Sequence, residues 1–476
     1  MAKHYEGAAA VLPRTHKWVV SRGIKLQIKS SRTNLIRAYE ARWPIGKEMG
    51  IHARIAVTKG VKRMARTSIP TTRTRPISTV SARATAAFSR ARRPTPKYAP
   101  KSAPKPPFST PVKTAIARRK LALLLPGRDE ELIIATTIAS AVKAGQPLRD
   151  IYVVDDGSTD DTRIEALKLL PPENVLTVIN GGKARAVMAG IKQFDIESRY
   201  TWLHVADADS IFCPDYFKMY KRKLDPKKYA VAVGFVQSLR GNWISRYRAF
   251  CYTYGQHILR RFQSWMGMIS VFPGPITCFR TDIIKDLDFT AESLTEDFDL
   301  TLQVHRKQLG AIKFIPEAIN YTQDPQTLRD FIKQTRRWQR GFFQGVVKYK
   351  IGRRLHKIDV SIGYQLMELL FYIIEIFVLI PYIVITTGRW TVIPIVLMSD
   401  FLVVCALALF SSAAARRPSI ILSLPYFYIL RWVELSIVIT SFIEVVVLHK
   451  FRGVKNGWET KGRRYALNPK ALKDTA

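Results

Sequence analysis

The chain has 476 residues and a formal net charge of +38 at pH 7, from 75 Lys and Arg against 37 Asp and Glu. That length suffices for one large domain with additional segments. The four cysteines have no CxxC spacing, so a secreted, disulfide-built scaffold is excluded and a reduced, cytosolic setting is expected. Residues 1–30 contain no apolar signal-peptide core, and no such peptide is expected.

The positive charge is concentrated near the N-terminus, where residues 1–120 hold 28 Lys and Arg against 3 Asp and Glu. Residues 1–117 are predicted to be basic and largely disordered, because stretch 61–117 is rich in Arg, Pro and Ser and has little apolar surface to bury. Their charge suits anionic lipid headgroups, although a solvated tail without a partner is the alternative. Specific nucleic-acid recognition is not expected, since aromatic residues for base stacking are scarce.

From Lys120 onwards, apolar strands alternate with helical stretches. Strands are predicted at Leu121–Leu125, Ile151–Val154, Val175–Ile179 and Thr201–Val205. The intervening helices predict an α/β fold with a parallel sheet covered on both faces. Chemistry is then expected at the carboxyl ends of the strands, where polar motifs occur.

Three of these polar motifs suit a phosphorylated ligand. Asp207 and Asp209, two residues apart after a strand, could hold Mg²⁺ or Mn²⁺ beside a diphosphate. Asp155 and Asp156 could place a carboxylate against a base N–H or ribose hydroxyls, although a simple strand-to-helix turn is the alternative. Lys183, after a Gly pair, could reach a phosphate or could be an ordinary surface lysine.

Two further motifs lie near the middle of the chain. Asp297, in Thr295-Glu296-Asp297, could act as a general base for an acceptor hydroxyl, or these acids could simply favour a helix N-terminus. In Gln334-Thr335-Arg336-Arg337-Trp338, the Trp-Arg pair suits stacking on a sugar and neutralising a phosphate. An exposed amphipathic helix is the alternative for that segment.

Taken in order, the motifs resemble glycosyltransferase family 2, in particular the membrane-embedded synthases of cellulose, chitin, hyaluronan and poly-N-acetylglucosamine. The resemblance covers Leu121–Trp338, with a looser likeness up to Gly457–Thr460. It rests on the following segments: Pro126-Gly127-Arg128-Asp129-Glu130 (Asp129 standing where the family has Asn), Asp155–Ser158, Gly182-Lys183-Ala184, Asp207-Ala208-Asp209, Gly274-Pro275, Thr295–Asp297, and Gln334, Arg337 and Trp338.

This resemblance implies a GT-A, Rossmann-like catalytic domain and a set of residue roles. Asp297 would be the catalytic base, and Asp207 and Asp209 would hold Mg²⁺ or Mn²⁺. The implied donor-binding residues are Asp129, Glu130, Asp155, Asp156, Lys183 and Asp207. The implied acceptor- and diphosphate-binding residues are Glu296, Gln334, Arg337 and Trp338.

The activity implied is inverting, metal-dependent transfer from a nucleoside-diphosphate sugar, a UDP-sugar by resemblance, to a growing β-linked polysaccharide. The partners would be that donor, an oligosaccharide or lipid acceptor, and membrane lipids. Single transfer to a lipid acceptor is one alternative. A membrane-anchored basic binding protein with a decayed catalytic domain is another, which the complete set of acidic residues disfavours.

The C-terminal third is apolar. Leu369–Thr387 and Val392–Phe410 each approach the ~20 residues of a spanning helix, and Ile420–Leu448 is a third, longer segment. An integral membrane protein with a cytoplasmic catalytic domain is expected. Because three crossings would place the basic tail outside, either Ile420–Leu448 makes two short passes or re-enters, or one of the segments lies in the interface.

The predicted domains are 1–117, a GT-A domain with interfacial helices at 118–350, a transmembrane region at 360–450 and a basic cytosolic tail at 451–476. Ionisable residues inside the apolar segments are expected to face a polar conduit, because they are costly in lipid; pairing with one another or snorkelling to the headgroups is the alternative. They are Glu375, Asp400, Arg431, Glu434 and Glu444.

Overall fold

The computed structural model describes residues 119–289, 293–353 and 356–450. All of them lie in one compact unit, Ser109–Ala476. The predicted disordered region 1–117 and the predicted tail 451–476 fall outside the described residues, and these two assignments stay predictions.

The α/β part of the unit is built on one eight-stranded sheet, with strand order β3-β2-β1-β4-β7-β6-β8-β5. The strands are β1 (Arg119–Gly127), β2 (Ile151–Asp155), β3 (Val175–Thr177), β4 (Tyr200–Val205), β5 (Ile211–Phe212), β6 (Tyr229–Ser238), β7 (Thr277–Arg280) and β8 (Ala311–Thr322).

The sheet is mixed, which corrects the prediction of a parallel sheet. Strands β1 to β4 pair in parallel as predicted. Strand β7 is antiparallel to both of its neighbours, β4 and β6. Strand β6 then pairs in parallel with β8, and β5 pairs antiparallel with β8. The second half of the sheet is thus held together by strands from distant parts of the sequence, which local patterning does not reveal.

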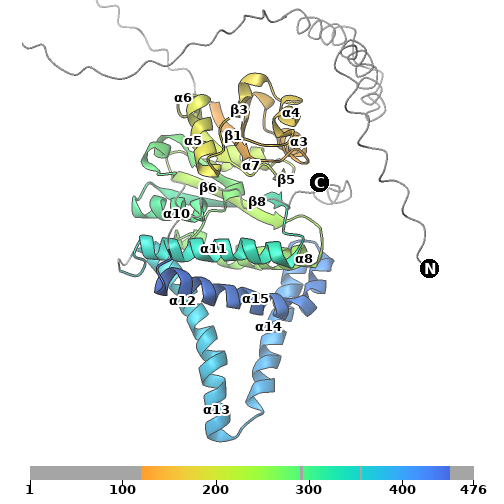
Figure 1. Cartoon of the computed structure of the whole chain (residues 1–476), viewed down its shortest axis with the longest axis vertical. Helices are drawn as coiled ribbons and strands as arrows, with labels where there is room; N and C mark the ends of the chain where they lie inside the picture. The colour runs from red at the N-terminus through yellow and green to blue at the C-terminus, as the bar shows by residue number, and fades with distance from the viewer. Residues whose placement is uncertain (1–118, 290–292, 354–355, 451–476) are drawn as a thin grey trace, which may run out of the picture. The chain divides into compact units, whose positions relative to one another are not determined.

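The centres of β1 and β2 are apolar because both faces of the sheet are covered there. In β1, Leu121, Leu123 and Leu125 pack on one face with α3 and α7. Ala122 and Leu124 point to the opposite face, where α5 and α10 cover them. The fold class is therefore the expected α/β arrangement, with helices on both sides (Figure 1).

The helices fall into a group around the sheet and a second group below it (Figure 1). The first group is α3 (Ile134–Lys143), α4 (Thr162–Leu167), α5 (Lys183–Gln193), α6 (Ile196–Arg199), α7 (Tyr216–Lys223), α9 (Arg261–Met266) and α10 (Glu296–Arg306). The second group is α8 (Trp243–Tyr254), α11 (Leu328–Lys348), α12 (Lys357–Ile374), α13 (Ile380–Thr387), α14 (Val392–Ala414) and α15 (Leu424–Phe442).

Two of the predicted membrane segments form long helices that point away from the sheet (Figure 1). Within the described residues, Lys357–Thr387 and Val392–Ala414 are long and apolar enough to cross a membrane. Their large side chains are exposed, including Phe371, Phe377 and Leu402. Exposed apolar surface of this extent marks an interaction site for lipid or protein.

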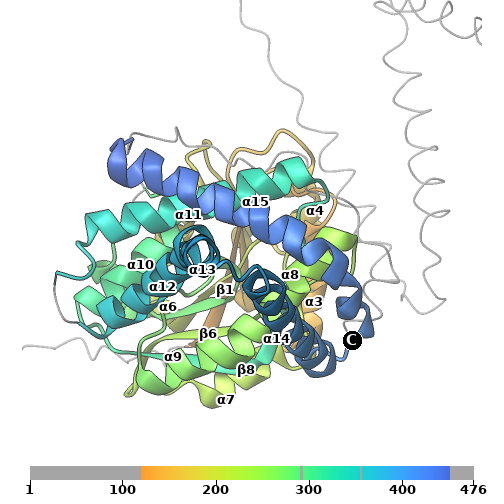
Figure 2. The ribbon, with the colours of Figure 1, turned by 90° about the horizontal axis from the view of Figure 1, so that it is seen from below.

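The third apolar segment, Ile420–Leu448, does not extend beside them. Its helix α15 lies across α11 and α8, as Figure 2 shows from below. Phe427 and Leu430 pack there with Phe250 and Phe331. The segment thus packs against helices of the same unit, and its course relative to a membrane stays a prediction.

The expectation of a polar conduit stays a prediction. Of the ionisable residues in these segments, Arg431 and Asp400 pair with one another, as in the alternative. Arg431 donates to both carboxylate oxygens of Asp400, at 2.8 and 3.0 Å. Arg340 pairs with Glu444. Glu434 accepts from Tyr247, as described below. Glu375 is exposed.

Candidate active site

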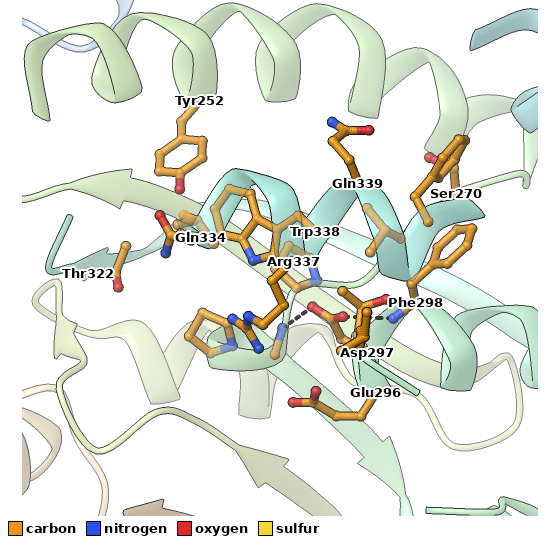
Figure 3. Close-up of a pocket in the computed structure, with 18 of the residues that line it drawn as sticks. Tyr252, Ser270, Glu296, Asp297, Phe298, Thr322, Gln334, Arg337, Trp338 and Gln339 are labelled. Atoms are coloured by element: carbon orange, nitrogen blue, oxygen red, sulfur yellow. Dashed lines mark hydrogen bonds between the residues drawn. The ribbon is translucent and has the colours of Figure 1, made fainter. Parts of the chain in front are cut away.

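A cavity of about 790 Å³ opens at the carboxyl end of β4 and runs beneath the sheet to α11, α12 and α15. Five of the predicted site residues, all of them on α10 or α11, line this cavity together (Figure 3). They are Glu296, Asp297, Gln334, Arg337 and Trp338. Glu130, Lys183, Asp207 and Asp209 also line the cavity.

The loop carrying Asp207 and Asp209 is fixed by the elements on either side. Strand β4 ends at Val205, and the Ala206 N–H donates to Leu124 of β1. The carbonyl of Ala208 accepts from Thr137 of α3 at 2.7 Å. Because Ala208 is buried between the two carboxylates, both acids are held at the cavity.

Lys183 is one of the cations that line the cavity, together with Arg260 and Arg337. Its Nζ lies 2.5 Å from Asp207 Oδ1 and 3.4 Å from Glu296 Oε1. Burial works against its charge, but Asp207 and Glu296 outweigh burial and raise the pKa of Lys183 above its usual range. Lys183 is therefore a permanent positive charge that a diphosphate can displace from its carboxylate partners.

Asp156 holds the loop that precedes Lys183, the first residue of α5. Its carboxylate accepts from the backbone N–H groups of Gly181 and Gly182, at 2.9 and 2.8 Å. Gly182 has a φ of +87°, a conformation that favours glycine. The Asp156 side chain, fully buried, thus holds the loop that delivers Lys183 to the cavity.

Asp155 and Asp129 bind backbone in the same way, and neither lines the cavity. Asp155 Oδ1 accepts from the Ser158 N–H at 2.9 Å. Asp129, at a φ of +55°, accepts from the Thr159 N–H at 2.7 Å, and its own N–H donates to Ser158 Oγ. Direct contact of these three aspartates with a donor stays a prediction.

Asp297 lies in the first turn of α10, facing the cavity. Its Oδ1 accepts from the Phe298 N–H at 2.8 Å, and Oδ2 accepts from the Gly274 N–H at 3.2 Å (Figure 3). The protein packed around it and the neighbouring Glu296 raise the pKa of Asp297 to about 6, against the opposing effect of Lys183. A carboxylate with that pKa is ionised at neutral pH and able to accept a proton.

Two glycines let α11 approach α10 closely enough to share the cavity. A Cβ on Gly341 would lie 2.2 Å from Thr295 Oγ1, and one on Gly345 would lie 2.4 Å from Phe298 Cε1. Larger residues would push α11 away from the Glu296–Asp297 turn. This close contact brings α11, with Arg337, to the cavity that Asp297 also lines.

Two of the predicted residues on α11 keep unsatisfied polar atoms. The Nε of Arg337 and the Oε1 of Gln334 are buried and have no hydrogen-bond partner among the described residues. Buried polar atoms normally have partners. Both atoms are therefore suited to a polar ligand in this cavity.

Sequence reasoning missed several cavity residues. Burial raises the pKa of Asp324, which follows β8, to about 7. Burial lowers the pKa of Arg260 to about 10, and Arg260 lies in a π-helical turn, Gly255–Arg260. Neither residue belongs to a motif with recognisable spacing. They reach the cavity because β8 joins the sheet and α8, which precedes the π-helical turn, packs against β6.

The two cavity carboxylates fit a divalent cation that also binds a diphosphate. Within the described residues no group of three or more His, Cys, Asp or Glu could hold an ion. Asp207 and Asp209 alone supply hard oxygen ligands, and Mg²⁺ commonly takes one or two carboxylates plus substrate phosphates. The donor set thus suits a metal that arrives with a nucleotide.

Comparison with known proteins agrees with this geometry. Residues 118–341 match the model described as "Glycosyltransferase like family 2". The chain is 26% identical over 227 residues to poly-beta-1,6-N-acetyl-D-glucosamine synthases of Staphylococcus epidermidis and Staphylococcus aureus (strain COL). Those matches cover 46% of this chain and 54% of each relative, so the chain spans about half the length of these curated relatives.

Two solved structures show limited similarity to this chain, each with a TM-score below 0.5. A mannosyltransferase from Pyrobaculum calidifontis, in complex with GDP-Man and Mn²⁺, has a TM-score of 0.44 at 14% identity, covering 66% of this chain and 87% of its own. Glucosyl-3-phosphoglycerate synthase from Mycobacterium tuberculosis has a TM-score of 0.35 at 17% identity, covering 50% and 81%. The α/β fold described above and the family match coincide over residues 118–341, which match glycosyltransferase family 2.

Proposed function

We propose that this chain transfers a sugar from a UDP-sugar to the hydroxyl of a growing β-linked polysaccharide, with inversion, at a membrane surface. The observation that carries the proposal is the placement of Lys183, Asp207 and Asp297 around one cavity with Arg337 and Trp338. N-acetylglucosamine is the first sugar to test, because the relatives' names specify it.

On the donor side, Lys183 and Arg337 would bind the diphosphate. Lys183 is a point charge already held at the cavity, and Arg337 carries a buried Nε without a partner among the described residues. Asp156 supports this grip indirectly by fixing the loop before Lys183. Asp129, Glu130 and Asp155 would complete the nucleoside side.

Asp207 and Asp209 would hold Mg²⁺ or Mn²⁺ against the diphosphate. When bound, the cation would neutralise charge on the departing nucleoside diphosphate.

On the acceptor side, Asp297 would take the proton of the attacking hydroxyl. The acceptor oxygen then bonds to the anomeric carbon while the bond from that carbon to the diphosphate oxygen breaks, which releases UDP. Gly274 and Phe298 donate to Asp297 and hold its carboxylate in place. Glu296, Gln334 and Trp338 would bind the acceptor sugar, with the Trp338 ring as a stacking surface.

We further propose that Lys357–Thr387 and Val392–Ala414 cross the membrane as a hairpin. Their exposed apolar side chains support this. The tip between them carries a single basic residue, Arg389, whereas the remainder of the chain is strongly basic. Positive residues favour the cytoplasmic side, which supports a cytoplasmic catalytic domain.

Single transfer to a lipid acceptor is a second candidate. The cavity extends to apolar residues of the helical layer, including Leu366 and Leu369 on α12 and Val438 on α15. An acceptor with an apolar tail could enter from that end.

The test is a UDP-release assay on purified protein with a panel of UDP-sugars, followed by sizing of the product. One UDP-sugar should support release and yield chains of many residues. Release with a single added sugar would favour the lipid-acceptor candidate. No release from any UDP-sugar, with or without Mn²⁺, would refute the proposed donor.

A further inference from the structure

Arg248 of α8 belongs to none of the motifs, yet it contacts the helix that carries Trp338. The side chain is buried, with 5% of its surface exposed. Its Cζ lies 4.7 Å from the ring centroid of Trp338 and 4.4 Å from that of Phe331. Its Nη2 donates to Thr335 Oγ1 at 2.8 Å. Because Phe331, Thr335 and Trp338 are spaced four and three apart, they share one face of α11.

The guanidinium suits this position better than an ammonium would. It is planar and stacks on aromatic faces, while its fork of donors fixes its orientation in the plane. The hydrogen bond to Thr335 uses one arm of that fork, and the rings of Phe331 and Trp338 flank the group. An attractive cation–π contact of this kind favours one orientation of the indole.

A second contact holds Arg248 from the other side. Glu434 of α15 lies 3.7 Å from Arg248, between Oε1 and Nη1. Its other oxygen, Oε2, accepts from the Tyr247 hydroxyl at 2.7 Å. Arg248 is therefore fixed between α15 and α11, and the position of Trp338 depends on both.

We propose that Arg248, held by Glu434, is a positioning residue that fixes the Trp338 indole for stacking against the acceptor sugar. This rests on the proposed function, in which Trp338 contacts the acceptor. Arg248 is not among the residues that line the cavity, whereas Trp338 is (Figure 3). Arg248 thus acts through Trp338 and leaves the donor side unchanged.

The first measurement separates acceptor from donor kinetics in the full-length protein. The substrates are UDP-N-acetylglucosamine and a soluble β-1,6-linked N-acetylglucosamine oligosaccharide. Arg248→Met should raise the acceptor KM about tenfold, which lies within the range for losing a cation–π contact. Donor KM and slow donor hydrolysis should stay within about twofold. Arg246→Met is the matched control, because Arg246 lies on the same helix and takes no part in this cluster among the described residues.

A double-mutant cycle tests whether the effect passes through the indole. In a Trp338→Phe background, Arg248→Met should raise the acceptor KM by much less than in the wild-type background. Equal fold-changes in the two backgrounds would overturn the proposal. If Arg248→Met does not fold, Arg248→Lys replaces it, since it keeps the charge but not the planar fork.

The second measurement needs no turnover. In protein labelled with 5-fluorotryptophan, the ¹⁹F resonance of Trp338 is assigned by its loss in Trp338→Phe. Arg248→Lys and Arg248→Met should shift or broaden that resonance, Glu434→Gln should shift it less, and Arg246→Met should not. An unmoved Trp338 resonance would overturn the positioning role. Absence of turnover in the wild-type protein would instead refute the proposed function.

Discussion

Carboxylates at the two halves of the sheet edge are used in opposite ways. After β1 and β2, Asp129, Asp155 and Asp156 accept hydrogen bonds from backbone N–H groups of neighbouring loops. After β4 and at the start of α10, Asp207 and Glu296 share the ammonium of Lys183, beside Asp297. The first set holds loops in shape, whereas the second set surrounds the place where chemistry is proposed.

This difference shows that the presence of an acidic motif at a strand end does not by itself indicate whether its carboxylates hold a loop or face a ligand. A carboxylate that accepts backbone N–H groups away from the cavity fixes a turn. A carboxylate that faces the cavity can also meet a ligand, as is proposed for Asp297 although it accepts from Gly274 and Phe298. Substitutions in the first set should therefore mainly lower stability, and substitutions in the second set should mainly lower turnover.

The largest effect is expected from disturbing the proposed metal ligands. Asp209→Asn, or excess chelator, should lower sugar transfer at least about 100-fold, because a cation supplies several kcal/mol of charge stabilisation. The melting temperature of the substrate-free protein should change little, since Asp209 lies at the cavity surface. UDP release with and without EDTA checks this, and full activity in chelator would contradict it.

The second-largest expected effect is a loss of kcat/KM at acid pH. Asp297 has its pKa raised to about 6, and it must be unprotonated to act as a base. Its active form is therefore fully present well above pH 6 and is lost as the pH falls through 6. At pH 5 we expect kcat/KM to be about tenfold below its plateau. A plateau that extends below pH 5 would remove Asp297 from the titrating role.

A smaller effect is expected from separating α10 and α11. Gly345→Ala would press a methyl group against Phe298, and overpacking of this kind costs about 1–3 kcal/mol. Both the melting temperature and turnover should fall. Gly363→Ala on α12 is the matched control, since a Cβ there meets nothing within 4 Å in the described structure. Equal behaviour of the two variants would contradict the close-contact account.

The smallest effect on turnover at saturating donor is expected at Asp156. Asp156→Asn leaves one buried N–H without its acceptor, which should lower the unfolding free energy by about 1–3 kcal/mol. Asp161→Asn, at an exposed position in the same loop region, is the control. Thermal unfolding checks the loss, and an Asp156→Asn variant as stable as the wild type would break the contrast between the two halves.

Much of the first half of the fold could be predicted from the sequence. Strands β1, β2 and β4 are continuous apolar runs because each is buried on both faces. The second half could not, since β7 pairs with β4 and β6 across long stretches of sequence. Nothing in the local pattern of Thr277–Arg280 indicates an antiparallel strand between two others.

The site was predictable to the extent that its residues belong to short motifs. Lys183, Asp207 and Asp297 were expected together and do line one cavity. Arg248 and Asp324 were not expected, because their positions depend on how α8 and β8 pack. In the apolar third, Asp400 and Arg431 could be seen as costly residues, but only the packing of α14 on α15 shows that they pair.

The central claim is that Asp297 is the base for glycosyl transfer in this cavity, and one variant tests it most directly. Asp297→Asn should lower transfer by about 10²–10⁴-fold, the usual contribution of general-base catalysis. UDP affinity, measured by calorimetry on the same preparation, should stay within about twofold, and the melting temperature should be preserved. Transfer close to the wild-type rate in a folded, UDP-binding Asp297→Asn protein would contradict the account.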